Sequence, residues 1–240
     1  TVITHPYKGF PANKAGIKVG DEIVSVDGKN IQGKSTAEIS ALLKGQPKTE
    51  VTVRIRRYGQ KENISLKILR EKITLSNLSY FGLVEPEIGY LRLDDFTPGA
   101  SREVSDALHN LKERGAKKVI LDLRDNPGGL LHEAVNIVSL FVPRGQEIVS
   151  TKGKVEEWNK SYRTLNSPLD IEIPIVVLVS EGSASASEIV AGALQDYDRA
   201  VLIGRKTFGK GLVQTTRQLA YNSQLKVTTA KYYIPSGRCI

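Results

Sequence analysis

The sequence predicts two folding units, a small β-rich module followed by a larger α/β domain. Up to about residue 72, short segments with period-two alternation stand between turn residues, which is typical of antiparallel strands. From about residue 73, apolar strands alternate with helical patterns, which is typical of an α/β domain. The chain has 240 residues, of which 40% are hydrophobic, so it can bury a sizeable core in each unit. We therefore expect domains at residues 1–72 and 73–240.

In the first module, each element has a local cause. Ser35-Thr36-Ala37-Glu38 is a capping box, which predicts a helix that ends near Gly45. Val51, Val53 and Ile55 alternate with polar residues, which predicts a half-buried strand whose arginines face solvent. The expected elements are a helical turn at 12–16, a strand at 21–26, a helix after Ser35, and strands at 51–56 and 64–68.

In the second domain, the apolar runs 119–123 and 175–179 predict buried strands. The expected strands are 88–93, 119–123, 175–179, 201–203 and 225–229, and the expected helices pass through 104–111, 134–138 and 189–194. Open α/β sheets bind ligands at the carboxyl ends of their strands. The loops after 119–123 and 175–179 are therefore the first places to look for chemistry.

Composition excludes several classes of function. The net charge is +8, but the basic residues are spread along the chain beside acidic ones, so we expect no nucleic-acid partner. No apolar run approaches the roughly 20 residues of a membrane span. Cys239 is the only cysteine and the three histidines lack ligand spacing, so we expect neither a disulfide nor a bound metal or cofactor.

Three turns carry the functional hypothesis. The first contains Gly128 and Gly129, whose amides at a helix start would suit an oxyanion hole. Taken alone, the pair is explained better by a tight turn that needs glycine torsions. The second contains Ser185, in a segment of small residues that would let a substrate backbone approach a nucleophile. A capping box of Ser185 and Glu188 is the structural alternative.

The third turn contains Lys210, and a neutral lysine beside Ser185 would make a serine peptidase without histidine or metal. Residues 204–210 match the spacing G-x-x-x-x-G-K of a phosphate-binding loop. Gly211 replaces the Ser or Thr that binds magnesium there, and the β-prone residues that follow do not supply the helix, so we reject nucleotide binding. An exposed lysine without a catalytic role is the remaining alternative.

The first module resembles a PDZ domain. The resemblance rests on Pro11-Ala12-Asn13-Lys14-Ala15-Gly16-Ile17, Gly20-Asp21-Glu22-Ile23 and Val26-Asp27-Gly28. Such domains bind a peptide's C-terminus by adding it as a strand to a sheet edge. The resemblance implies an N-terminally incomplete PDZ-like peptide-binding domain over residues 1–72, without the strand and loop that hold the carboxylate. A plain β-rich spacer is the alternative.

Nearly the whole chain resembles the carboxyl-terminal processing peptidases, also called tail-specific proteases. The motifs are Ile88-Gly89-Tyr90-Leu91-Arg92-Leu93, Leu121-Asp122-Leu123-Arg124-Asp125-Asn126-Pro127-Gly128-Gly129, Gly182-Ser183-Ala184-Ser185-Ala186-Ser187-Glu188, Thr207-Phe208-Gly209-Lys210-Gly211 and Tyr232-Tyr233-Ile234-Pro235-Ser236-Gly237. The resemblance implies a crotonase-like (ClpP/crotonase type) α/β peptidase core over residues 73–240, C-terminally incomplete. It implies a metal-independent Ser-Lys dyad that needs no cofactor.

By position, the resemblance places the nucleophile at Ser185, the general base at Lys210 and a supporting polar residue at Gln214. It places oxyanion donors at the amide of Ala186 and at either Gly128 or Gly129. A lysine has an ordinary pKa of about 10.4, so we expect desolvation in a closed cleft to keep the Lys210 amine neutral.

The resemblance implies protein or peptide substrates with free C-terminal tails, which the PDZ module would recruit or gate. It implies a periplasmic or other extracytoplasmic location and leaves room for peripheral membrane association and for homo-oligomers formed through regions outside this chain. A non-catalytic PDZ-containing scaffold or ligand carrier is the alternative function. An acyl-thioester enzyme follows only from fold analogy.

Overall fold

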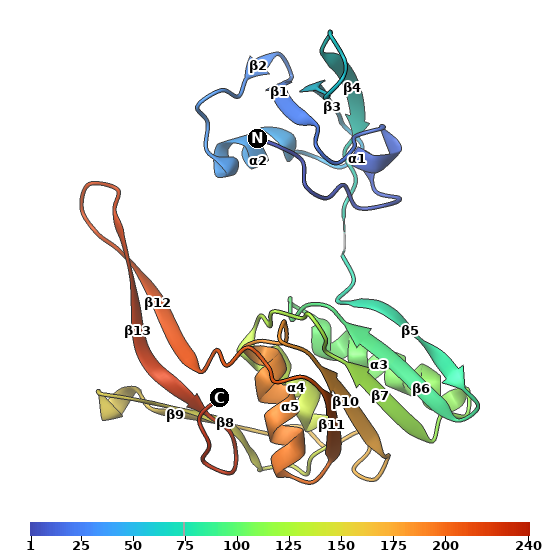
Figure 1. Cartoon of the computed structure of the whole chain (residues 1–240), viewed down its shortest axis with the longest axis vertical. Helices are drawn as coiled ribbons and strands as arrows, with labels where there is room; N and C mark the ends of the chain where they lie inside the picture. The colour runs from blue at the N-terminus through green and yellow to red at the C-terminus, as the bar shows by residue number, and fades with distance from the viewer. Residues whose placement is uncertain (74) are drawn as a thin grey trace. The chain divides into compact units, whose positions relative to one another are not determined.

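The computed structural model describes residues 1–73 and 75–240, which form two compact units, Thr1–Leu75 and Ser76–Ile240 (Figure 1). Each unit has its own core of buried apolar side chains. The structure thus contains a β-rich unit followed by a mixed α/β unit, in the order that the hydrophobic periodicity predicted.

The first unit is a four-stranded sheet in the order β2-β1-β3-β4 with two short helices. Its elements are α1 (Pro11–Lys14), β1 (Glu22–Val26), β2 (Lys29–Asn30), α2 (Thr36–Leu43), β3 (Glu50–Arg56) and β4 (Ile64–Leu69). The predicted capping box forms, because Glu38 N–H donates to Ser35 Oγ at 3.3 Å and Ser35 N–H donates to the Glu38 carboxylate at 2.8 Å. Helix α2 ends at Leu43, two residues before the predicted Gly45.

The second unit is built on a five-stranded sheet in the order β11-β10-β7-β6-β5. Only β5 runs antiparallel to its neighbour, and β6, β7, β10 and β11 are parallel. The strands are β5 (Leu78–Glu85), β6 (Ile88–Leu93), β7 (Lys118–Asp122), β10 (Ile175–Val179) and β11 (Ala200–Gly204). The carboxyl ends of β7 and β10 lie side by side, since Leu178 is in register with Asp122.

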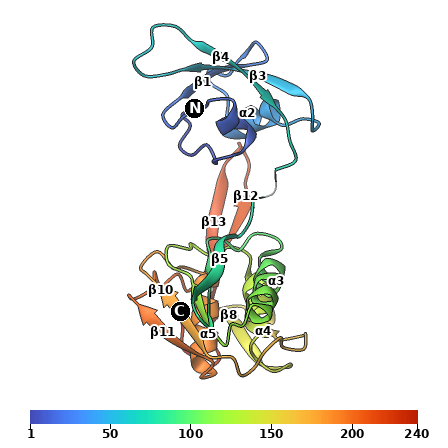
Figure 2. The ribbon, with the colours of Figure 1, turned by 90° about the vertical axis from the view of Figure 1, so that its right-hand side faces the viewer.

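The core of this unit lies between the sheet and three helices, α3 (Ala100–Glu113), α4 (Leu131–Ser139) and α5 (Ala186–Asp196). Figure 2 shows α3 and α4 side by side on one face of the sheet. Apolar residues at helical spacing on α3, namely Val104, Leu108 and Leu111, are buried against that face. The two strands predicted to be buried, β7 and β10, alternate buried and half-buried residues over 119–121 and 175–179, because only one face of the sheet is covered by the helices.

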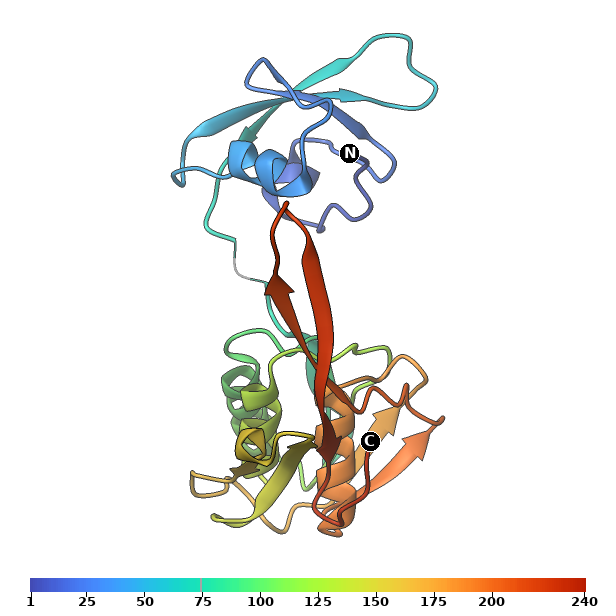
Figure 3. The same cartoon turned by 90° about the vertical axis from the view of Figure 1, so that its left-hand side faces the viewer.

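A second sheet of four strands, in the order β12-β13-β8-β9, adjoins the core. Its strands are β8 (Glu147–Gly153), β9 (Lys160–Arg163), β12 (Leu212–Gln218) and β13 (Gln224–Tyr233), and a 3-10 turn, Glu156–Trp158, links β8 to β9. The β12–β13 hairpin extends well beyond the rest of the second unit (Figure 3). No helix within residues 1–73 and 75–240 is long and apolar enough to cross a membrane.

Candidate active site

The loops that follow β7 and β10 are held together through Asn126. This buried side chain accepts a hydrogen bond from Gly128 N–H at 2.9 Å and donates one to the Leu93 carbonyl at 2.8 Å. Its backbone carbonyl accepts from Ala184 N–H at 3.0 Å and from the Ser187 hydroxyl at 2.9 Å. The hydrogen bonds of Asn126 therefore join the glycine turn to the serine segment, although Gly128 and Ser185 are 57 positions apart in the chain.

Gly128 packs directly against Ser185. A methyl group at Gly128 would lie 2.5 Å from the Ala184 carbonyl oxygen, 2.8 Å from the Ala186 nitrogen and 2.8 Å from Ser185 Cβ. The φ of Gly128 is also +94°, a conformation that side chains disfavour. Two constraints therefore require glycine here, and the turn and the oxyanion interpretations both remain compatible with the site.

Gly129 differs from Gly128 in exposure and in hydrogen bonding. Phe96 donates to the Gly128 carbonyl at 3.4 Å and accepts from Leu130 N–H at 2.8 Å, so Gly129 directs its own peptide groups away from Phe96. Gly129 is exposed, whereas Gly128 is buried. Within the described residues, the Gly129 N–H has no acceptor, and the Gly128 N–H is already occupied by Asn126.

Ser185 sits at the N-terminus of α5 in an unusual conformation, with φ +56° and ψ −111°. Ser183 and Ser187 are fully buried, and their hydroxyls bond the Leu123 carbonyl at 2.7 Å and the Asn126 carbonyl at 2.9 Å. Ser185 is half-buried, and no partner for its hydroxyl occurs in the described part of the chain. Of the three serines, only Ser185 therefore has a free hydroxyl.

The capping alternative for Ser185 is also present. The Glu188 carboxylate accepts from the Ser185 N–H at 2.8 Å, which is one half of a capping box. The geometry of the other half is present as well, because the Glu188 N–H lies by the Ser185 side chain. This N–H donates to the Ser185 carbonyl oxygen at 3.0 Å, however, and the side chain makes no cap hydrogen bond. The cap is therefore compatible with a free hydroxyl at Ser185.

Glu188 also binds the loop that contains Lys210. Its buried carboxylate accepts from Gly209 N–H at 2.6 Å and from Lys210 N–H at 2.9 Å. Phe208 N–H adds a hydrogen bond to the Ser183 carbonyl at 3.0 Å. Sequence reasoning assigned Glu188 only to the capping box, because nothing in the local pattern signals a contact 22 residues away.

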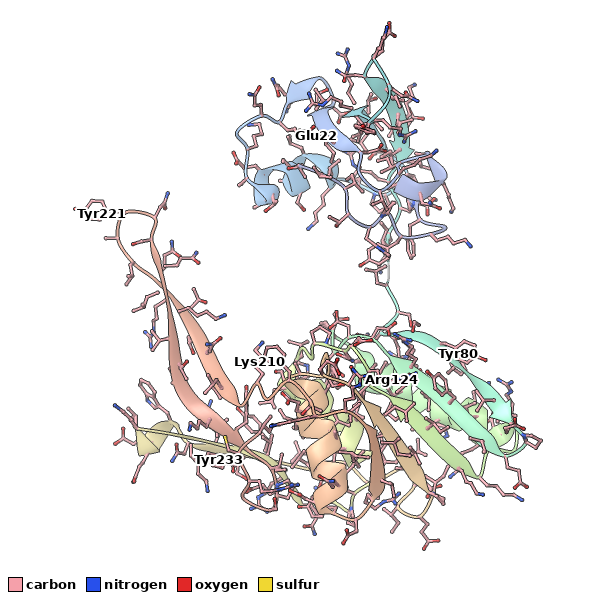
Figure 4. All side chains as sticks on the ribbon, viewed as in Figure 1. Glu22, Tyr80, Arg124, Lys210, Tyr221 and Tyr233 are labelled. Carbon is pink, nitrogen blue, oxygen red and sulfur yellow. The ribbon has the colours of Figure 1, made fainter. Side chains whose placement is uncertain are left out.

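The Lys210 side chain is exposed, in contrast to the expected burial in a closed cleft. Figure 4 shows it at the base of the β12–β13 hairpin, beside the end of α5. Neither the Lys210 amine nor the Ser185 hydroxyl has a hydrogen-bond partner among the described residues, so the contact between these two residues runs only through their backbone N–H groups, which share the Glu188 carboxylate. Gln214, on β12, lies 3.5 Å from the Thr228 hydroxyl and is exposed.

A buried ionic cluster anchors the start of the glycine loop. Asp122, at the end of β7, accepts from Tyr90 Oη at 2.6 Å and from the Arg124 guanidinium at 2.6 Å. Burial raises the pKa of Asp122, but the hydrogen bonds from Arg124 and Tyr90 outweigh it and hold the pKa below its ordinary value. The same contact raises the pKa of Arg124. Asp122 therefore remains ionised and holds Arg124 at the start of the glycine loop.

Two further side chains with reactive groups are exposed. His132 lies on α4 beside Glu133. Cys239 is a free thiol next to the loop of Lys210, since a methyl group at Gly211 would lie 3.3 Å from its Sγ. Within the residues that the structure describes, no group of three or more His, Cys, Asp or Glu side chains could hold a metal ion.

Known proteins resemble this chain in sequence and in fold. Residues 87–240 match the model of peptidase family S41, and residues 2–57 match a PDZ domain model. The chain is 42% identical over 241 residues to a probable CtpA-like serine protease of Staphylococcus aureus strain N315, covering 100% of this chain and 47% of that protein. It is 42% identical to a carboxy-terminal-processing protease of Bartonella bacilliformis, covering 99% of this chain and 55% of that protein.

Among solved structures, the photosystem II D1 C-terminal processing protease is similar, with a TM-score of 0.61 and 34% identity. The match covers 99% of this chain and 64% of that chain. A putative S41 protease from Bacteroides fragilis shares the fold at 18% identity with a TM-score of 0.61. The chain spans about half the length of the curated relatives it matches. The expected resemblance is confirmed, and the chain belongs to peptidase family S41, with a PDZ domain preceding the peptidase region.

Proposed function

We propose that this chain supplies the catalytic machinery of a serine endopeptidase with a Ser-Lys dyad, in which Ser185 is the nucleophile and Lys210 the general base. One observation carries the proposal. The Glu188 carboxylate binds the backbone N–H groups of Ser185 and Lys210 at 2.8 and 2.9 Å and so fixes both residues against one buried group. The free hydroxyl of half-buried Ser185 and its position at a helix N-terminus support the assignment.

In the proposed mechanism, the neutral Lys210 amine takes the proton of Ser185 Oγ as this oxygen attacks the scissile carbonyl carbon. The amine, now charged, gives the proton to the leaving nitrogen, and an acyl ester remains on Ser185. Water then attacks the ester with Lys210 again as base, which restores both side chains. Because Lys210 is exposed in the free chain, we infer that a bound substrate excludes water from the amine.

The oxyanion of the tetrahedral intermediate would be bound by the backbone N–H of Ala186 and of one glycine. Ala186 N–H is the first of α5, where free amides and the helix dipole favour negative charge. The exposed and unoccupied N–H of Gly129 favours this residue over Gly128, whose N–H is bonded to Asn126. Gln214 is proposed to orient the Lys210 amine once substrate is bound.

For the remaining parts of the chain, we propose that residues 1–72 bind free C-terminal tails of protein substrates, and that residues 73–240 form a crotonase-like core. The parallel sheet with three helices on one face supports the second assignment. The similarity to CtpA-like and carboxy-terminal-processing proteases supports an extracytoplasmic, periplasmic location. Peripheral membrane association and self-association through regions beyond this chain are part of the same hypothesis.

The alternative function is a non-catalytic scaffold with a PDZ domain. The Glu188 contacts argue against it, since a scaffold has no need to hold a free hydroxyl and a lysine loop on one carboxylate.

The test compares the chain with its Ser185→Ala and Lys210→Arg variants, using an unfolded protein as substrate, with and without a metal chelator. We expect chelator-insensitive cleavage by the parent chain and none by either variant, because arginine cannot act as a base at neutral pH. The matched control is Lys206→Arg, at an exposed lysine of the same loop. Near-normal cleavage by Lys210→Arg would reject the dyad, and no cleavage by the parent would favour the scaffold.

A further inference from the structure

Strand β12 forms one edge of the four-stranded sheet, and no other strand of the described residues pairs with its outer side. In the order β12-β13-β8-β9, β12 pairs only with β13 among the described residues. Such an edge presents unpaired N–H and C=O groups, which proteins usually cover or block with charges or proline. Residues 212–218 contain no proline, and the only charged residue among them is Arg217. This edge is therefore open to another strand.

The register identifies which residues face outward. Leu219 N–H donates to the Ser223 carbonyl, and Tyr232 N–H donates to the Gly211 carbonyl, both at 2.9 Å. Since inward and outward peptide groups alternate along an antiparallel strand, the odd-numbered residues of β12 bond to β13. The even-numbered residues then direct their N–H and C=O groups to the free edge. These are Leu212, Gln214, Thr216 and Gln218.

The charge of the hairpin restricts the partner. Residues 212–233 contain Arg217, Lys226 and Lys231 but no Asp or Glu. Lys226 lies opposite Thr216, and Lys231 lies opposite Leu212. Each lysine side chain is therefore on the same face of the sheet as the β12 residue that it pairs with. A partner with acidic or neutral side chains fits this surface better than a basic one.

The free edge is also continuous with the candidate active site. β12 begins two residues after Lys210, and the Lys210 N–H shares the Glu188 carboxylate with the Ser185 N–H. A chain that pairs with β12 at Leu212 would therefore run directly past the lysine. We propose that an extended segment of substrate polypeptide, with acidic or neutral side chains, adds to the free edge of β12 as a further strand and is thereby led to Ser185. This inference rests on the proposed peptidase function.

The test measures binding to the full chain with Ser185→Ala, so that no cleavage is needed. The probe is a short fluorescent peptide of Val, Ser and Glu whose C-terminus is amidated, which removes the carboxylate that a PDZ domain would bind. A second probe is N-methylated at two adjacent central residues, so that neither of its edges can pair. A control probe carries two extra methyl groups on side chains instead, because Thr replaces Ser at two positions.

We expect N-methylation to weaken binding about five-fold or more, and the control probe to bind like the parent. Exchange of Glu for Lys in the probe should also weaken binding. In the protein, Thr216→Pro removes one outward N–H but none that bonds β13, and should weaken binding of the parent probe similarly. Thermal unfolding checks that the Thr216→Pro variant is folded. If this variant does not fold, the N-methylated probe still tests the proposal on the chain that carries only Ser185→Ala.

Equal binding of the parent and N-methylated probes would overturn the proposal, as would unchanged binding by a folded Thr216→Pro variant. Dimerisation of the chain that Thr216→Pro abolishes would assign the edge to a second copy and would also overturn it. If N-methylation weakens binding as expected but the parent chain cleaves no substrate, the dyad is rejected and strand addition to β12 remains supported. The two hypotheses therefore fail separately.

Discussion

The buried carboxylate of Glu188 lies 2.9 Å from the backbone nitrogen of Lys210, a residue 22 positions further along the chain. The same carboxylate accepts from Gly209 and Ser185. Two hydrogen bonds to this carboxylate thus join the start of α5 to the loop that leads into β12, and the third holds Ser185 at the start of the helix. If the proposed dyad is correct, Glu188 is a positioning residue that acts through the two backbones and does not touch substrate.

Glu188→Gln should lower kcat about 10- to 100-fold and leave KM nearly unchanged. The glutamine amide retains one acceptor oxygen but presents an NH₂ group to a backbone N–H, so at least one of the three hydrogen bonds is lost. Steady-state kinetics with an unfolded protein substrate measure the effect. Glu181→Gln is the control, since Glu181 is exposed beside Arg205, and should change kcat less than two-fold. A normal kcat in Glu188→Gln would contradict the positioning role.

Gly128→Ala should abolish activity and destabilise the fold. Its methyl group would lie 2.5 Å from the Ala184 carbonyl, in a turn that cannot yield without displacing Ser185. Gly145→Ala is the matched control. Gly145 also has a positive φ, of +87°, but a methyl group there meets nothing within 4 Å, so only a backbone strain of about 1 kcal/mol is expected. Equal losses of activity in the two variants would show that contact with Ser185 is unimportant.

Ser183→Ala should lower the stability of the fold, whereas Ser185→Ala should abolish cleavage and leave the stability nearly unchanged. Ser183 Oγ donates to the Leu123 carbonyl and accepts from Ser180 N–H at 2.9 Å. Its removal leaves the Ser180 N–H unpaired and takes one of the two hydrogen bonds of the Leu123 carbonyl, which should cost about 1–3 kcal/mol of unfolding free energy. Ser185→Ala removes an unbonded hydroxyl and should change stability by less than about 0.5 kcal/mol while it abolishes cleavage. Urea unfolding and a cleavage assay separate the two. A larger loss of stability in Ser185→Ala would be inconsistent with its free hydroxyl.

Acid should weaken the contact between α3 and the segment before β10. Burial raises the pKa of Asp170, but the ion pair with Lys112 and the N–H groups of Glu172 and Ile173 outweigh it and lower the pKa from 3.8 to about 2. Because the pKa is lower in the folded chain, this stabilisation is complete above about pH 4 and is lost as the pH falls toward 2.

Asp170→Asn should therefore lower the unfolding free energy at pH 7, and its difference from the parent chain should shrink between pH 4 and pH 2. Urea unfolding at several pH values provides the measurement. Asp198→Asn, at an exposed turn, is the control and should show no such convergence. A difference that stays constant down to pH 2 would mean that the Asp170 carboxylate does not stabilise the fold through its charge.

The sequence alone determined the two units, most of the strands and helices, and the family. These features depend on local causes. The capping box at Ser35 and the alternation in 51–56 act within a few residues, and the motifs around Ser185 and Lys210 are continuous segments. The expected domain boundary at residue 72 and the roles of the site residues remain predictions.

Only the tertiary structure decided which polar groups are left free. Nothing local distinguishes Ser185 from Ser183 and Ser187, whose hydroxyls are bound by carbonyl groups about 60 residues away. The same holds for Glu188, which holds a distant loop. The structure also exposes Lys210, which the sequence argument had expected to be buried. Hydrogen-bond partners and burial arise from contacts between segments that lie far apart in the chain, and for that reason periodicity and motif spacing do not reveal them.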